Sequence, residues 1–100
     1  MIKNGTRLQS QVCDTQVIVV KSAESLAELR AGGAPMVPVG TPISTEAALD
    51  PALSSGSSMG KRYVDESGAE VLVTKPGAGT LSVGDKPLTV KQAAALPASD

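Results

Sequence analysis

Aromatic residues are almost missing from this chain. Its 100 residues include no Phe and no Trp, and Tyr63 is the only aromatic side chain. Aromatic side chains bury about 150–250 Å² each and usually dominate small cores. Val, Ile and Leu must therefore form the core, at about 1.5–3 kcal/mol per fully buried side chain. We expect a thin core with little net stability, which association would increase.

Histidine is also absent, and there is a single cysteine, Cys13. His is the most frequent general acid–base residue, so Ser-His-Asp and Cys-His arrangements cannot form within this chain. One Cys without His cannot supply the ligands of a zinc site. The sequence therefore predicts that the chain is not an enzyme by itself. It identifies no catalytic residue, no metal site and no cofactor.

A single thiol excludes an intrachain disulfide and favours a reducing, cytoplasmic location. No apolar run approaches the roughly 20 residues of a membrane span, and the first residues lead into no signal-peptide core. Cys13 stands in a segment of alternating polarity, with no cation and no helix start predicted beside it. We therefore expect a buried, inert thiol.

The charges are nearly balanced. Nine basic and ten acidic residues give a net charge of −1, and the longest basic run is Lys61-Arg62. Nucleic-acid binding needs a basic face to neutralise phosphates, and single-strand binding needs aromatic stacking platforms. Both are missing, so we expect no nucleic-acid partner.

The clearest strand pattern covers residues 7–21. Residues 8–13 alternate in polarity with period two, and residues 17–20 form a continuous β-branched run. Such a run is typical of a strand that is covered on both faces. Asp14 lies between the two patterns and predicts a bulge or a tight bend.

The period changes at residues 22–30, which predict one short helix. Ser22 is the expected N-cap, and Gly32-Gly33 the expected C-terminal stop. Residues 34–60 contain four prolines and a Ser/Gly tract, and we expect them to form a long flexible loop. Within it, residues 45–49 can form one helical turn before Pro51 ends it.

The remainder reads as a meander. Pro87 cannot donate to a ladder, which places its strand at a sheet edge. A helical turn is expected at residues 92–96. The chain is thus predicted to be a single mainly β domain over residues 1–100, a small barrel or sandwich of five to six strands with one short helix and a long central loop. The meander strands are expected at residues 61–64, 70–74, 80–83 and 86–90.

Two resemblances accompany this pattern. Residues 17–21, then Gly32-Gly33 and a long loop, resemble the start of a bacterial co-chaperonin over about a third of the chain. The glycine-rich roof hairpin and the closing strand of that family are not recognisable here. Residues 5–13, 32–36 and 74–81 resemble small actinobacterial β-rich proteins to which no activity is attached.

The second resemblance concerns the thiol. It implies further cysteines near the positions of Ala31 and Val73, so that three thiols could converge into a metal or redox site. This chain has Ala31 and Val73 instead, which would abolish such a site.

We therefore expect a non-catalytic domain that works by self-assembly or by docking to a larger protein partner, and that binds no membrane. The run at residues 17–20 needs cover on both faces, and one short helix can cover only one. A second copy of the chain is expected over the other, with Val17 and Val19 as the interface candidates. Two alternatives stay open: an accessory subunit whose Cys13 region completes a cofactor or active site of a larger enzyme, and a small-molecule-binding barrel.

Overall fold

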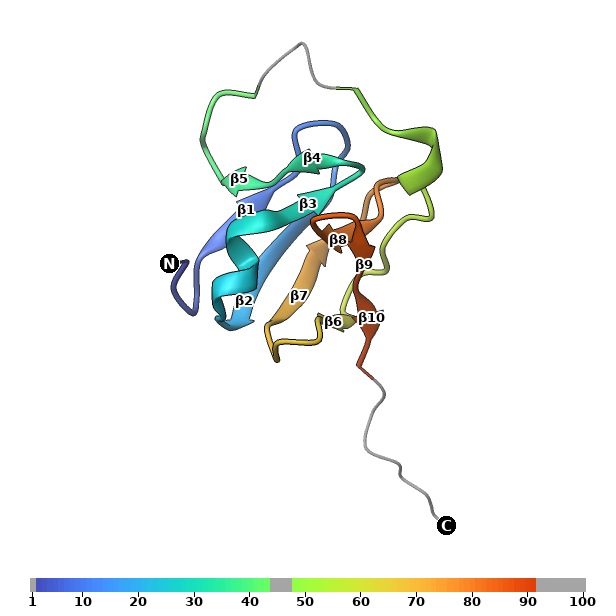
Figure 1. The fold of residues 1–100 in the computed structure, drawn as a ribbon. Helices are drawn as coiled ribbons and strands as arrows, with labels where there is room; N and C mark the ends of the chain where they lie inside the picture. The colour runs from blue at the N-terminus through green and yellow to red at the C-terminus, as the bar shows by residue number, and fades with distance from the viewer. Residues whose placement is uncertain (1, 44–47, 92–100) are drawn as a thin grey trace.

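The computed structural model describes residues 2–43 and 48–91, in which ten short strands form two antiparallel sheets (Figure 1). The larger sheet has the order β10-β6-β7-β2-β1-β5 and the smaller one β4-β3-β8-β9. The predicted mainly β class is confirmed, but the described residues form no closed barrel. The elements are β1 (Arg7–Gln9), β2 (Gln16–Lys21), the 3₁₀ helix η1 (Glu24–Glu28), β3 (Leu29–Ala31), β4 (Ala34–Pro35), β5 (Val37–Pro38), the 3₁₀ helix η2 (Pro51–Leu53), β6 (Arg62–Val64), β7 (Glu70–Lys75), β8 (Leu81–Val83), β9 (Lys86–Pro87) and β10 (Thr89–Val90).

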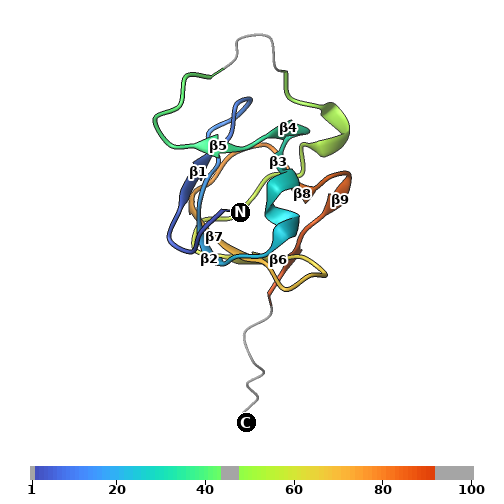
Figure 2. The same cartoon turned by 60° about the vertical axis from the view of Figure 1, so that its left-hand side comes forward.

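Two bent segments connect the sheets at their edges. The chain passes from β4 to β5 at Met36, and from β9 to β10 at Leu88, each time leaving the smaller sheet for the larger one. At each bend the backbone stays hydrogen-bonded, because Met36 N donates to Leu29 O (3.0 Å) and Leu88 N donates to Leu81 O (2.9 Å). The two sheets therefore enclose one core between them (Figure 2).

The centre of this core is aliphatic. Val17 pairs with Val73, and Val19 with Val71, across the central strands β2 and β7. All four side chains are at most 2% exposed. Val20, by contrast, is 38% exposed, so the expectation that the run 17–20 is covered on both faces is wrong. The helix η1 contacts β8 of the smaller sheet.

The helix predicted over residues 22–30 is shorter than expected. It is reduced to the 3₁₀ helix η1, and Leu29 already belongs to β3. Ser22 does not cap it, because its N–H donates to Asn4 Oδ1 (2.7 Å) and its hydroxyl to Ile2 O. Ala23 is the N-cap residue. No described helix has the length and apolar character needed to cross a membrane.

Gly32 and Gly33 form the turn between β3 and β4 and do not end a helix. Their φ angles are +64° and +90°. Two successive positive φ angles are the requirement of a tight two-residue hairpin turn, which glycine meets without strain. The glycine pair therefore reverses the chain between two strands.

The described parts of residues 34–60 are attached to the domain. Backbone bonds run from Asp50 N to Gly32 O (2.9 Å), from Ser57 N to Gly77 O (3.1 Å) and from Thr80 N to Leu53 O (2.8 Å). Asp50 also caps η2, which begins at Pro51, so that proline starts a helical turn where we expected it to end one. The turn expected at 45–49 lies mostly outside the described residues.

The β6–β7 and β8–β9 connections are the predicted tight turns. Asp65 Oδ1 accepts the N–H groups of Ser67 (3.1 Å) and Ala69 (2.9 Å), which closes the first turn. Gly84, with a φ angle of +61°, begins the second. Pro87 lies in the edge strand β9, as predicted. The helical turn expected at 92–96 lies outside the described residues.

One carboxylate is buried at the start of β7, a central strand of the larger sheet. Glu70 is 8% exposed in its side chain and accepts bonds from Arg62 Nη1 (3.4 Å) and Lys91 Nζ (3.1 Å). Both cations are about half exposed. These charge-assisted bonds join the start of β6 to the residue that follows β10.

We predict that Glu70→Ala lowers the free energy of unfolding by about 1–3 kcal/mol, because a buried acceptor with two charged donors is lost. Glu66→Ala is the matched control, since Glu66 pairs with Lys86 (2.7 Å) fully at the surface. The control should leave stability nearly unchanged. Urea denaturation of both variants measures the difference, and equal effects would contradict the role assigned to Glu70.

Candidate functional site

The thiol of Cys13 lies at one end of the sandwich, between the loop that joins β1 to β2 and the loop that joins β7 to β8. Its Sγ is 3.2 Å from Ser10 Oγ and 3.2 Å from Thr15 Oγ1. Gly79 N donates to the same sulfur at 3.3 Å. We call these four residues the thiol cradle. It brings together Cys13 and Gly79, which are 66 residues apart in the sequence.

The first loop is shaped by Ser10. Its hydroxyl oxygen accepts the N–H groups of Val12 (3.0 Å) and Cys13 (3.1 Å), and its own N–H donates to Thr15 O (2.9 Å). Hydroxyl-to-backbone bonds of this kind compete with strand pairing and favour turns. The bend predicted at Asp14 is thus a whole turn over residues 10–15, and the serine was the signal for it.

The second loop approaches so closely that it requires glycine. A Cβ atom on Gly77 would lie 2.4 Å from Thr15 N. One on Gly79 would lie 3.0 Å from Cys13 Sγ and 2.7 Å from Gly32 N. Side chains at these two positions would separate the loops, so the Pro-Gly-Ala-Gly sequence serves close backbone approach.

The environment of the thiol changes its acidity. Burial raises the pKa of Cys13, but hydrogen bonds with the side chains of Ser10 and Thr15 and with the backbone of Thr15 and Gly79 lower it, and the net pKa is below the ordinary value of 9.0. The sulfur is also only half-buried. The expectation of a buried thiol is therefore wrong. Gly79 N–H donates to the sulfur and two hydroxyl groups lie within hydrogen-bonding distance of it, so the lowered pKa favours the thiolate, which is the nucleophilic form.

The cradle holds no second metal ligand. Among residues 2–43 and 48–91, no three His, Cys, Asp or Glu side chains lie close enough together to hold a metal ion. Ala31 and Val73 are core residues, at 0% and 1% exposure. The three-thiol site implied by the resemblance does not fit the residues present here.

The interface candidates Val17 and Val19 lie elsewhere than expected. They are 0% and 2% exposed and point into the core of their own domain, so neither can face a partner. The reason is strand alternation, which sends Ile18 to the opposite face. On that outer face Ile18 pairs with Leu72 across β2 and β7.

A row of four side chains crosses the outside of the larger sheet. Ile18 is paired with Arg7 of β1 on one side and Leu72 on the other, and Leu72 is in turn paired with Arg62 of β6. We call Arg7, Ile18, Leu72 and Arg62 the docking row. A groove of about 440 Å³ lies beside it and includes Lys75. The row combines an aliphatic centre with cationic ends.

We predict that Thr15→Val raises the pKa of Cys13, because the variant keeps the shape of the side chain and loses one bond to the sulfur. The rate of alkylation by iodoacetamide against pH measures this, with the urea-unfolded chain as the reference for an unperturbed thiol. In the wild type the inflection should lie below that reference. Stability should therefore rise as pH increases between the two pKa values, because the unfolded chain then binds more protons. Coincident inflections in the folded and unfolded chain would contradict this.

Protein-family models, curated proteins and solved structures were compared with this chain, and none matches it. A function must therefore be argued from two features of this structure, the thiol cradle and the docking row.

Proposed function

We propose that the chain is a non-catalytic domain that works by self-assembly through the outer face of its larger sheet. The observation that carries the proposal is the docking row. Ile18 and Leu72 stand in register on the two central strands, and both side chains are partly exposed on the outer face. Aliphatic pairs at the middle of a sheet gain free energy when a partner covers them.

The edge strands of both sheets favour association through a sheet face over association through strand pairing. Each edge strand is two residues long, and three of the four contain proline: Pro35, Pro38 and Pro87. Short edges and prolines prevent pairing with strands of other chains. A partner is then expected to bind through side-chain packing on the outside of a sheet.

Two other functions were open from the sequence. A small-molecule barrel is disfavoured because aliphatic side chains fill the space between the sheets. An accessory subunit that completes a partner's active site is favoured by one observation, the lowered pKa of Cys13. Co-purification with an enzyme whose activity is lost on Cys13→Ser would support that second function. A cytoplasmic location stays a prediction from the single thiol.

We predict that the wild-type chain, with a monomer mass of 10.1 kDa, has a multiple of that mass in solution. Ile18→Asp should dissociate it while the fold is retained, because the charge would be buried in the interface but exposed to water in the monomer. Ile43→Asp is the matched control, since Ile43 is 48% exposed outside the docking row. Light scattering coupled to size exclusion measures the masses, and circular dichroism checks the fold. A monomeric wild-type chain would contradict the proposal.

A further inference from the structure

The charged side chains divide between the two outer faces of the sandwich. The strands of the larger sheet carry four cations and one carboxylate, and that carboxylate, Glu70, is already paired with Arg62 and Lys91. Arg7 and Lys75 form no ion pair with any other described residue. This face is therefore basic around the aliphatic pair of the docking row. The four cations are Arg7, Lys21, Arg62 and Lys75.

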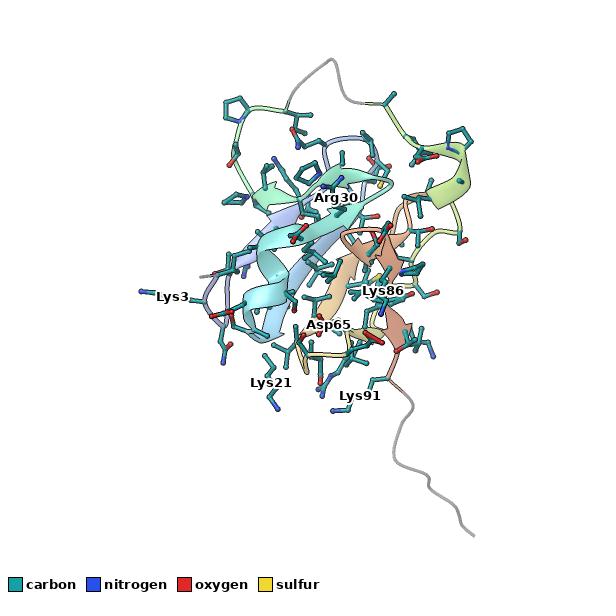
Figure 3. The ribbon with its side chains drawn as sticks, in the orientation of Figure 1. Lys3, Lys21, Arg30, Asp65, Lys86 and Lys91 are labelled. Atoms are coloured by element: carbon teal, nitrogen blue, oxygen red, sulfur yellow. The ribbon has the colours of Figure 1, made fainter. Side chains whose placement is uncertain are left out.

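Carboxylates gather beside the smaller sheet, in the segments that flank its strands. A hollow of about 460 Å³ is lined there by the carboxylates Glu28, Asp50 and Asp85, together with Arg30. Arg30 points outward, because its strand neighbours Leu29 and Ala31 are buried. Figure 3 shows it on the front of β3. We call this feature the acidic hollow. Leu53 and two glycines complete its lining.

The docking row and the acidic hollow lie on different layers. Figure 2 separates the layer of β1, β2 and β7 from the layer of η1, β8 and β9, and each feature lies on the outside of its own layer. A two-fold dimer that paired two docking rows would bring Arg7 and Arg62 of one copy toward the same cations of the other. Like charges facing each other suppress an interface.

We infer that copies of this chain associate head to tail, with the docking row of one copy against the acidic hollow of the next. The inference rests on the proposed self-assembly and names its two surfaces. Arg7 and Lys75 would face the three carboxylates, and Ile18 and Leu72 would meet Leu53, the apolar part of the hollow. Opposite charges across an interface set its orientation.

Arg30 also contributes to this fit. Within the described residues its guanidinium makes one weak bond, from Nη1 to Gly33 O at 3.4 Å, and its buried Nε has no acceptor. The outer nitrogens of this guanidinium, and not its buried Nε, are the donors to which Gln16 of the next copy, which lines the groove beside the docking row, would offer an amide oxygen. Because the two surfaces differ, an open assembly always keeps one free docking row at one end and one free acidic hollow at the other, so growth ends only in a ring or continues as a filament.

Two double variants test the inference. Arg7→Glu with Lys75→Glu disables the basic face, and Glu28→Lys with Asp85→Lys disables the acidic hollow. Each variant alone should be a folded monomer by light scattering and circular dichroism. An equimolar mixture should assemble again, because the intact hollow of one variant fits the intact basic face of the other and the two reversed surfaces also carry opposite charges. Lys3→Glu and Glu66→Lys are the matched controls at exposed charges outside both surfaces, and both should keep the wild-type mass.

The outcomes separate the inference from the function on which it rests. A monomeric wild-type chain overturns both. If the wild-type chain assembles and either double variant keeps the same mass, only the head-to-tail arrangement is overturned. A mixture of the two double variants that stays monomeric overturns it as well. The expected assembly also loses mass at high ionic strength, because salt screens exposed charge pairs.

Discussion

The pairing of β2 with β7 is the constraint on which the rest of this domain depends. These are its two longest strands, of six residues each, and they place Val17 against Val73 and Val19 against Val71. With one aromatic residue in the chain, these valines are the centre of the core. Strand alternation then sends Ile18 to the outside. The same pairing that fills the core therefore creates an aliphatic strip on the surface.

Local sequence patterns predicted the strands and tight turns because those signals lie within a few residues. They failed at Leu29, whose neighbours are good helix formers. There, pairing with Val83 of β8 extends a sheet and outweighs helix propensity. The segment 34–60 looked free because no local pattern reveals bonds such as Thr80 N to Leu53 O. Long-range backbone hydrogen bonds thus determine both the strand at Leu29 and the attachment of residues 34–60.

The thiol cradle and the docking row were likewise predictable from the sequence only in part. A β-branched run does not reveal which of its residues face inward, so Val17 and Val19 were the wrong interface candidates and Ile18 was missed. The bend beside Cys13 was predicted from Asp14 alone, although Ser10, close by in sequence, is the residue that shapes the turn. The hydrogen bond from Gly79 could not be predicted from the sequence, because its loop is 66 residues away from Cys13 along the chain. Cradle and row are both products of the tertiary fold.

We propose that the surface strip on β2 and β7 is stabilised by a second copy of the chain. The melting temperature, measured over about a hundredfold range of protein concentration, tests it most directly, because binding that is restricted to folded chains makes this temperature concentration-dependent. If the folded chain self-assembles, its melting temperature rises with protein concentration. A constant melting temperature, together with a monomeric mass over the same range, would contradict it.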